Sequence, residues 1–524
     1  MSDAAVHGDD TTLEGDDAIC LGETLTISDV VAIAKGAPAK LSEGAHLRIE
    51  ASRATVERAV ASGAVVYGVT TGFGSLAEVR LDPTDADRLQ HSLLRTHAVA
   101  VGPELSAMEV RAMLVLRAHV LGLGYSGVRR ELAERFVDML RLGILPVVPE
   151  QGSLGASGDL APLAHLALGA LGEGRVHYSG SEMTSAEALA RCGLAPIKLK
   201  AKEGLALING TQGMTAIGAL AADRARTLSK TADIAAALTI EGILGTDRAF
   251  DLRVISLRPH PGQQAAADNL LRLLSGSEIL ASHLHSRHIV QDAYSIRCTP
   301  QVHGAFRDVL ANTVETLEYE LAAVSDNPIV LSEDDEIISC GNFHGQPVAH
   351  ACDSLAAASV SLASISERRL YRLLDPKTSN GLPPFLVEDA GVNSGFMVCQ
   401  YTAASLVSES KSLAHPAAVD SITSSAGQED HVSMGMIAAR HARQCIGNAE
   451  AVVAMEVLAA TQACDLRSPL RPSPASAAVV GTLRRAIAHL REDRLLKPDV
   501  DAAIELVSSG ALVDAVEQEI GPLR

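Results

Sequence analysis

The residues best suited to chemistry lie in one glycine-rich stretch, GSLGASGDLAPLAH, at residues 152–165. Glycine-rich loops that precede a helix often bind phosphate. This stretch lacks the Gly-Lys-Ser/Thr ending of a P-loop, and Asp159 stands where a G-x-S-x-G nucleophile elbow needs its last glycine. Taken as a lone Ser-Gly-Asp, it is more simply a helix N-terminus capped by Ser157 or Asp159.

The complete string resembles the prosthetic-group loop of the histidine and aromatic amino-acid ammonia-lyases. In that family an Ala-Ser-Gly tripeptide, here Ala156-Ser157-Gly158, cyclises on itself. The resemblance implies that the Gly158 nitrogen attacks the Ala156 carbonyl carbon and that two waters leave. Ser157 becomes a 2,3-didehydroalanine, and the product is 4-methylidene-imidazol-5-one (MIO), an electrophile that needs no metal or diffusible cofactor. Gly158 has no Cβ, so its nitrogen can approach a carbonyl two residues back.

The resemblance extends from about residue 20 to residue 470, and the family's other motifs follow in order. One short motif could arise by chance, whereas seven in the same order argue for common descent. Besides the loop, the matching segments are residues 66–74, 202–214, 291–302, 341–349, 381–397 and 424–435.

The resemblance assigns roles to four residues outside the loop. Tyr67 matches the base that removes the substrate's β-proton; the alternative is a core aromatic at a strand end. Arg297 matches the partner of the substrate carboxylate, for which a guanidinium fork is suited; the alternative is a surface salt bridge. Asn209 and Tyr294 match residues that hydrogen-bond the ring oxygen and the substrate amine.

Three further positions match residues that line the family's site, with weaker roles: Gln291, Asn327 and Phe343. Asn327 is equally well explained by turn chemistry, because Asp-Asn-Pro at residues 326–328 is a turn signal.

Substrate choice depends on two places. His97 follows Thr96, where histidine-specific members carry Ser-His. Glu429 follows a glutamine, where phenylalanine- and tyrosine-specific relatives usually have Asn-Gln. A carboxylate can hydrogen-bond an imidazole but gains nothing from a phenyl ring; the alternative for Glu429 is an ion pair with an internal arginine. Ala100 replaces a common glycine, and we assign it no meaning.

These matches predict the non-oxidative deamination of L-histidine to trans-urocanate and ammonia, as in histidine degradation. The first alternative is a tyrosine or phenylalanine ammonia-lyase or 2,3-aminomutase with the same prosthetic group. A helical binding or structural protein with a dead site is the alternative from another class. The intact tripeptide, Tyr67 and Arg297 argue against it.

The composition indicates a globular chain of 524 residues, 47% hydrophobic and 20% charged. Its formal charge of -19 argues against nucleic acid and anionic membranes as partners, because both attract positive charge. The 8 cysteines show no CxxC spacing, so we expect free thiols in a reducing compartment. We see no signal peptide and no membrane span, and we expect a cytoplasmic protein.

Three Ala-rich segments without proline, residues 213–245, 348–374 and 432–466, predict long buried helices. Apolar residues at i+4 spacing over residues 128–140, followed by Gly143, predict an amphipathic helix with a glycine stop. AVVYGVTT at residues 64–71 predicts a strand followed by a loop.

We therefore expect a mainly α fold, a long-helix bundle with a smaller mixed N-terminal region, of the ammonia-lyase and fumarase type. The expected division is a disordered acidic tail at residues 1–18, an N-terminal domain carrying the MIO loop at 19–209, and a helical bundle at 210–524. The resemblance also implies a homotetramer whose sites are shared between chains.

One motif lies outside the family pattern: His283, His285 and His288 form H-x-H-x-x-H. Histidines at this spacing can bind zinc. The family does not use them as ligands, so we expect no metal.

Overall fold

The computed structural model describes residues 18–72, 83–286 and 290–524. The expected acidic tail, apart from Ala18, lies outside the described residues, as do Phe73, Gly74 and His288. The chain forms two compact units. The first comprises residues up to 152, residues 160–212 and residues 322–343, and the second comprises residues 153–159, 213–321 and 344–524. The boundaries expected from the sequence stay a prediction; the compact units group residues 153–159 with the long helices.

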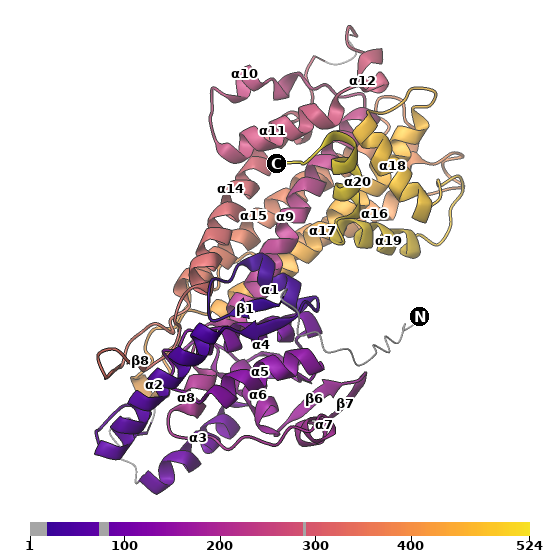
Figure 1. The fold of residues 1–524 in the computed structure, drawn as a ribbon. Helices are drawn as coiled ribbons and strands as arrows, with labels where there is room; N and C mark the ends of the chain where they lie inside the picture. The colour runs from indigo at the N-terminus through magenta and orange to yellow at the C-terminus, as the bar shows by residue number, and fades with distance from the viewer. Residues whose placement is uncertain (1–17, 73–82, 287–289) are drawn as a thin grey trace. The chain divides into compact units, whose positions relative to one another are not determined.

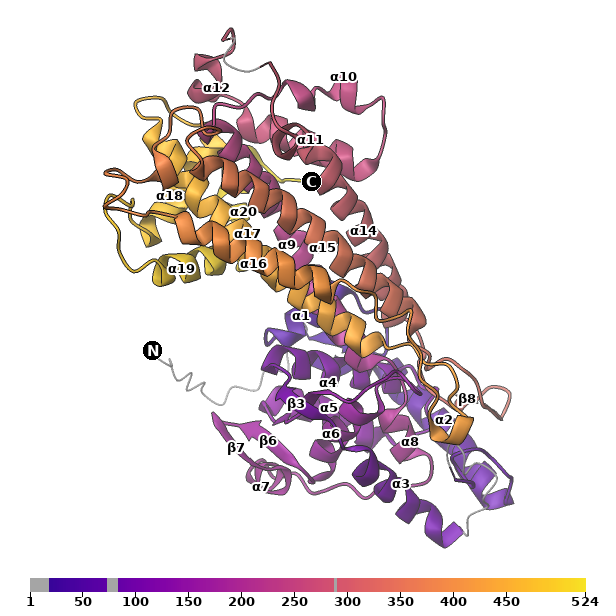
Figure 2. The same ribbon diagram turned by 180° about the vertical axis from the view of Figure 1, so that it is seen from behind.

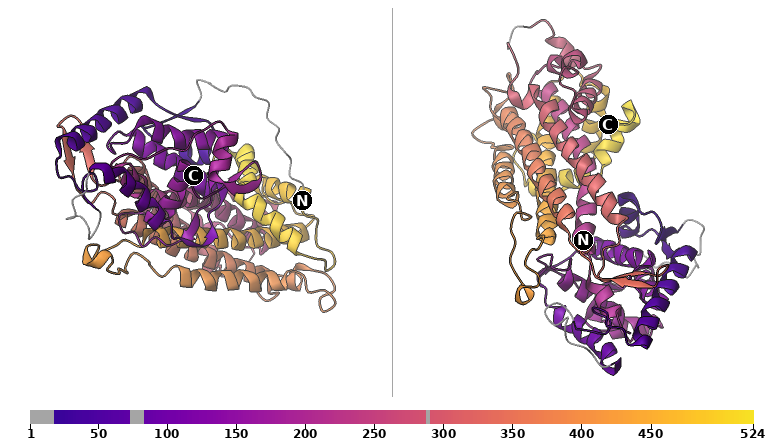
Figure 3. Two further views of the ribbon diagram at one scale, coloured as in Figure 1. Left: turned by 90° about the horizontal axis from the view of Figure 1, so that it is seen from below. Right: turned by 90° about the vertical axis from the view of Figure 1, so that its left-hand side faces the viewer.

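The first unit combines helices with short sheets (Figure 1). Strands β1 and β2 pair in parallel, β3 pairs antiparallel with β5, and β4, β6 and β7 form an antiparallel sheet. Antiparallel β8 and β9 come from residues far along the chain, yet they lie beside α2 (Figure 3, left). The elements are β1 Ile19–Leu21, α1 Ile27–Ala34, β2 Ala39–Leu41, α2 Glu43–Ser62, α3 Pro83–His97, β3 Val101–Glu104, α4 Ala107–Gly122, α5 Arg130–Leu142, β4 Leu145–Pro146, β5 Pro149–Gln151, α6 Leu160–Leu171, β6 Arg175–Tyr178, β7 Ser181–Thr184, α7 Ser185–Arg191, α8 Glu203–Ile208, β8 Ile329–Leu331 and β9 Glu336–Ile338.

The second unit is a bundle of long helices in which α15, α16 and α17 run side by side (Figure 2). Its elements are α9 Gln212–Gly242, the 3-10 helix η2 Arg248–Phe250, α10 Leu252–Ile255, α11 Pro261–Leu274, α12 Glu278–Ser282, α13 Tyr294–Arg297, α14 Thr299–Leu321, α15 Gln346–Leu374, η3 Pro384–Leu386, α16 Met397–Leu413, η4 Ser425–Gly427, α17 Gly435–Leu466, α18 Pro474–Ala486, α19 Lys497–Ser508 and α20 Ala511–Ile520.

The three Ala-rich segments are the long helices α9, α15 and α17, as predicted. Small side chains let these helices approach closely. A Cβ on Gly242 of α9 would lie 2.8 Å from the Ala463 Cβ of α17, and one on Gly262 of α11 would lie 2.2 Å from the Gly304 carbonyl oxygen of α14. A larger side chain at either position would force the helices apart.

The amphipathic helix predicted before Gly143 is α5, and the prediction is confirmed. Leu132, Phe136 and Leu140 are buried on one face. The helix ends at Gly143, which takes the left-handed conformation (φ +69°) that glycine adopts without strain.

The strand predicted at residues 64–71 is wrong, because this segment is a turn. The backbone N–H of Val66 donates to the Thr70 hydroxyl (2.9 Å), and that of Gly68 donates to the Thr71 hydroxyl (3.1 Å). Threonine is β-branched and favours strands by propensity, but here its hydroxyls satisfy the local backbone instead. Val69 is fully buried in a small core with Val56 and Val330.

Helix α15 is long and apolar enough, by length and composition alone, to cross a membrane. It packs against α14, α16 and α17, and 56% of its most apolar window is buried by the protein itself. It also carries charged side chains that are buried, including Arg369 and Glu367. These properties are those of a core helix in a bundle.

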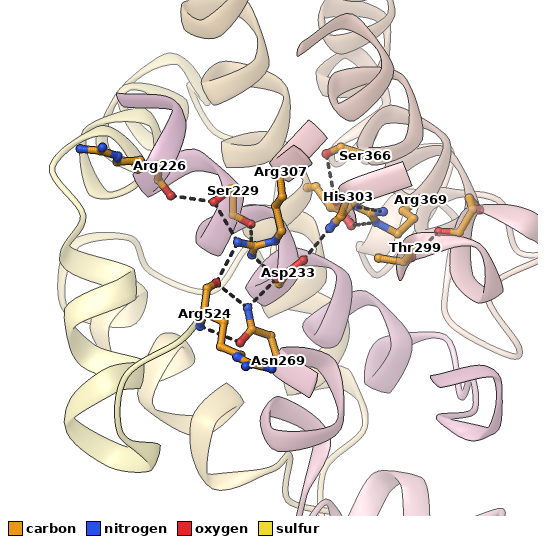
Figure 4. A network of polar contacts seen from close by, with 12 residues as sticks. Arg226, Ser229, Asp233, Asn269, Thr299, His303, Arg307, Ser366, Arg369 and Arg524 are labelled. Carbon is orange, nitrogen blue, oxygen red and sulfur yellow. Dashed lines mark hydrogen bonds and ion pairs between the residues drawn. The ribbon is translucent and has the colours of Figure 1, made fainter. Parts of the chain in front are cut away.

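The bundle contains a buried polar network that joins α9, α11, α14, α15 and α17 (Figure 4). His303 Nδ1 lies 2.7 Å from Asp233 Oδ1, and Arg369 Nη1 lies 3.2 Å from His303 Nε2. A carboxylate only accepts, so Nδ1 carries the proton and Nε2 accepts from the guanidinium. Arg369 also makes a two-pronged ion pair with Glu456 (2.5 and 2.9 Å), and neither side chain is exposed.

Candidate active site

The tripeptide predicted to cyclise lies in a tight turn of the second unit. Ser157 has φ +52° and Gly158 has φ +84°, and a bridge pairs Gly155 with Gly158. The Gly158 amide nitrogen lies 3.4 Å from the Gly155 carbonyl oxygen. A left-handed conformation costs a serine about 1–3 kcal/mol, so the surrounding structure imposes this turn.

That surrounding structure is the segment before α17. Ala156 is buried against Val432 and Met434, and the Met434 N–H donates to the Leu154 carbonyl (3.0 Å). Gly155 approaches this segment so closely that an added Cβ would lie 2.2 Å from the Ser433 hydroxyl. Contacts with residues 432–434 therefore fix one side of the turn.

Asp159 anchors the other end of the turn. Its carboxylate accepts from the Ser153 hydroxyl (2.9 Å) and from the Met214 N–H at the start of α9 (2.7 Å). The Ser153 hydroxyl in turn accepts from the Gly155 N–H (3.3 Å). Asp159 was expected as a possible helix cap; it fastens the loop to α9.

Tyr294 and Arg297 lie together in α13, where the guanidinium carbon is 4.5 Å from the centroid of the tyrosine ring. Arg297 Nε is buried and finds no hydrogen-bond partner in the described part of the chain. Tyr294 is 71% exposed and Gln291 is also exposed. Asp292 holds this segment, because its carboxylate accepts from the Thr246 N–H (3.0 Å) and hydroxyl (2.9 Å).

Glu429 is half-buried in the segment between α16 and α17. Its carboxylate accepts from the Ser424 hydroxyl (2.7 Å), and the two residues also pair through their backbones. Among the described residues it forms no ion pair with an arginine, so the internal pair considered from the sequence is not found there.

Tyr67 and His97 belong to the first unit. Tyr67 is half-buried in the turn that replaces the expected strand. His97 ends α3, and its Nδ1 lies 2.8 Å from the Leu93 carbonyl oxygen and 3.2 Å from the Thr96 hydroxyl. Because a carbonyl only accepts, Nδ1 carries the proton, and Nε2 is an acceptor in the neutral ring.

The first unit also brings Asn209 and Asn327 together, although they are far apart in the sequence. The Asn209 carboxamide donates to the Asn327 carbonyl (2.6 Å). The Asn327 side-chain oxygen accepts from the Ser339 hydroxyl (3.1 Å) and the Cys340 N–H (2.8 Å). The Asn327 side chain therefore shapes its own segment, which agrees with the turn alternative considered from the sequence. Phe343 is half-buried three residues beyond Cys340.

Sequence reasoning missed Arg117, which is fully buried in α4. It donates to the carbonyls of Ala206 (2.8 Å) and Asn209 (2.9 Å) and to the Gln212 side chain. A lone arginine within the apolar run MLVLRAHVL was the signal, because an arginine is rarely buried without acceptors.

The histidine motif does not form a metal site among the described residues. His283 is buried with Nδ1 and Nε2 each 2.8 Å from a backbone carbonyl, of Ile279 and Gly245 respectively. His285 is exposed, and His288 lies outside the described part of the chain. Within residues 18–72, 83–286 and 290–524, no three His, Cys, Asp or Glu side chains cluster so that they could hold a metal ion.

Comparison with known proteins places the chain in a family. The family model for aromatic amino acid lyases matches residues 25–485. The chain belongs to the aromatic amino acid lyase family. A histidine ammonia-lyase of Sorangium cellulosum is 52% identical over 513 residues, which cover 96% of this chain and all of that relative.

Two crystal structures of the aromatic amino acid lyase fold are also similar. Histidine ammonia-lyase from Trypanosoma cruzi has a TM-score of 0.89 at 41% identity, covering 96% of each chain. Tyrosine aminomutase from Streptomyces globisporus has a TM-score of 0.91 at 37% identity, covering 97% of this chain and all of that one. The mainly α fold is confirmed. Since both structures share it about equally, the choice of amino acid must come from side chains.

Proposed function

We propose that the chain is a carbon–nitrogen lyase that converts L-histidine to trans-urocanate and ammonia. The substrate loses a proton from Cβ and breaks its Cα–N bond, and a Cα=Cβ double bond forms, so the reaction needs no oxidant. The turn at Ala156-Ser157-Gly158 carries the proposal. The histidine ammonia-lyase that is 52% identical over nearly the full length supports it.

The residues of the turn fit the formation of MIO. Small Ala156 is 6% exposed, and Ser157 and Gly158 are already in left-handed conformations. The turn folds the backbone back on itself, with the Gly158 amide nitrogen 3.4 Å from the Gly155 carbonyl oxygen, and a chain already bent in this way favours closure of a small ring within it. Once formed, the group supplies an electrophile that the twenty side chains lack.

The chain's own side chains bind the substrate and move its proton. Tyr67, as the phenolate, accepts the β-proton at its oxygen. Arg297 binds the substrate carboxylate, and its buried Nε, which has no hydrogen-bond partner among the described residues, supports this role. Asn209 and Tyr294 hydrogen-bond the amine or the electrophile's oxygen, while Gln291, Asn327 and Phe343 line the site.

Two acceptors select the imidazole of the substrate in its protonated form, which carries two N–H donors. The hydrogen bond from Nδ1 to the Leu93 carbonyl leaves His97 Nε2 as an acceptor for an imidazole N–H. The Glu429 carboxylate is the second acceptor, and the hydrogen bond from the Ser424 hydroxyl helps to orient it. A phenyl ring would leave both acceptors unpaired, and a site built for hydrogen bonds rejects ligands that lack them by large factors.

Neighbouring copies of the chain complete the site, in a homotetramer. Ligand sites normally bury most of a small molecule's surface, whereas Tyr294 is 71% exposed in a single chain. Val392, Val419 and Ile422 are exposed as well, at 88%, 70% and 60%. The location we propose is the cytoplasm, where the eight free cysteines would stay reduced.

The experiment that tests the function is incubation of the pure protein with histidine, tyrosine and phenylalanine while the conjugated acid product is followed. Histidine should be deaminated and the other two left nearly untouched. Arg297→Lys should raise KM for histidine, because an ammonium cannot form the guanidinium fork. Preferential turnover of tyrosine or phenylalanine, or their conversion to β-amino acids, would favour the second candidate, which the similarity to tyrosine aminomutase keeps open.

A further inference from the structure

Three side chains clamp the segment that contains Asn327. Gln212 donates to the Ser325 hydroxyl (2.7 Å), and Asn209 donates to the Asn327 carbonyl (2.6 Å). Between them, the Lys202 ammonium donates to the Asp326 carboxylate (3.0 Å). All three donors come from residues 202–212, which comprise α8 and its flanks, so this short stretch determines where residues 325–327 lie.

The Lys202–Asp326 pair is unusual because neither side chain is exposed to any degree. Lys202 also has φ +74° just before α8, a left-handed conformation that is rare for a residue with a side chain. Burial lowers the pKa of Lys202, while the charge and hydrogen bond of Asp326 raise it. A left-handed lysine and a desolvated charge are each unfavourable, so the tertiary structure must hold both in place.

Asp326 links the Lys202 ammonium to the backbone of Asn327. Its second carboxylate oxygen accepts from the Asn327 N–H (2.6 Å), so its orientation sets the peptide plane before Asn327. The Asn209 carboxamide depends on the carbonyl of the same residue. Arg117 fixes the backbone of Asn209 from the other side, which leaves the Asn327 carbonyl as the contact that aims the Asn209 side chain.

We propose that Lys202 and Asp326 are positioning residues for the reaction: their buried ion pair sets the place of Asn327 and, through it, the direction of the Asn209 carboxamide. Neither residue touches the substrate. The inference rests on the proposed lyase function, in which Asn209 contacts the substrate amine or the electrophile.

A double-mutant cycle tests the inference. Lys202→Met should lower kcat about 10–100-fold, because small misplacements of a contacting group carry large penalties, with a smaller change in KM. In an Asn209→Ala background the same substitution should change kcat by less than about twofold, since the group it aims is gone. The matched control is Arg129→Met, which breaks the Arg129–Glu203 pair (2.8 Å) beside Lys202 at the start of α8, a pair that does not touch residues 325–327. Its effect should be the same with and without Asn209.

Two measurements do not depend on activity. Hydrogen exchange, read by mass spectrometry, should become faster at residues 322–329 in Lys202→Met and not in Arg129→Met. Intact mass should keep the loss of two waters in both variants, which separates misplacement of Asn209 from failure of ring closure. If Lys202→Met does not fold, Asp326→Asn replaces it. Lys202 can lose its proton there and keep a neutral hydrogen bond, so a few-fold loss of kcat is expected, again absent without Asn209.

Additive effects of the Lys202 and Asn209 substitutions, together with unchanged exchange at residues 322–329, would overturn the inference. Failure of the proposed lyase chemistry looks different, because the wild type would then act on none of the three amino acids, whereas turnover of tyrosine or phenylalanine instead of histidine would change only the substrate used in the cycle. The exchange comparison would still report whether the ion pair positions residues 325–327.

Discussion

Arg369→Met should strongly destabilise the helical unit, because it breaks an ion pair that has no access to water. Arg369 and Glu456 are both fully buried, and Arg369 also supplies the donor to His303 Nε2. After the substitution, Glu456 keeps only the hydroxyls of Thr239 (2.8 Å) and Ser366 (2.6 Å) among these partners. Two hydroxyls compensate a buried carboxylate poorly.

The magnitude follows from these contacts. Removing one partner of a buried ion pair costs about 3–5 kcal/mol, mostly because the other charge is left uncompensated. The lost donor to His303 adds about 1 kcal/mol, and the methionine side chain offsets part of this by filling apolar volume. We expect a loss of about 3–5 kcal/mol in the free energy of unfolding.

Urea unfolding followed by circular dichroism measures this loss, with two controls. Arg369→Met combined with Glu456→Met removes both charges and should recover most of the stability. Lys497→Met removes an exposed pair with Asp501 and should change little. Two results would refute the reasoning: a loss under about 1 kcal/mol for Arg369→Met, or a double variant as unstable as the sum of its single substitutions. Either result would mean that the Glu456 carboxylate does not destabilise the protein when it is buried without its arginine.

Four further outcomes are expected. Intact-protein mass should fall short of the sequence mass by two waters, and Ser157→Ala should have the full mass of its own sequence and no activity; full activity in that variant would exclude the mechanism. Tyr67→Phe should lower kcat by about 10²–10⁴-fold, the contribution of acid–base catalysis, and an unchanged kcat measured on histidine would mean that another group is the base. Glu429→Gln should sharply reduce histidine turnover while the mass loss persists, so loss of both would indicate that Glu429 acts in ring formation instead. Burial lowers the pKa of His303 in the folded state. Below about pH 6.5 an unfolded histidine takes up a proton, so the unfolded state binds more protons and the free energy of unfolding decreases as the pH is lowered. Urea unfolding at several pH values should show a smaller decrease in His303→Phe, and equal decreases in the two proteins would contradict this.

Local signals predicted much of the fold. The long helices α9, α15 and α17 follow Ala-rich, Pro-free segments because alanine favours the helix and leaves a surface that packs closely. The stop of α5 at Gly143 was also readable, since the left-handed C-cap is a property of one residue. The tripeptide proposed to cyclise, residues 156–158, was found through the resemblance of the complete string at residues 152–165 to the family's loop, a resemblance that consecutive residues can show.

The sequence determined which residues are present and what each can do; the tertiary structure decided which of them meet. Residues 64–71 have the propensity of a strand but form a turn, because the hydroxyls of Thr70 and Thr71 bind backbone N–H groups of the same segment. Propensity scales do not include such side-chain hydrogen bonds. The bond from Asn209 to Asn327 and the burial of Lys202 against Asp326 join segments more than a hundred residues apart. Such contacts depend on how the helices pack, and no local pattern records them, because a buried charge is tolerable only where the fold brings its partner.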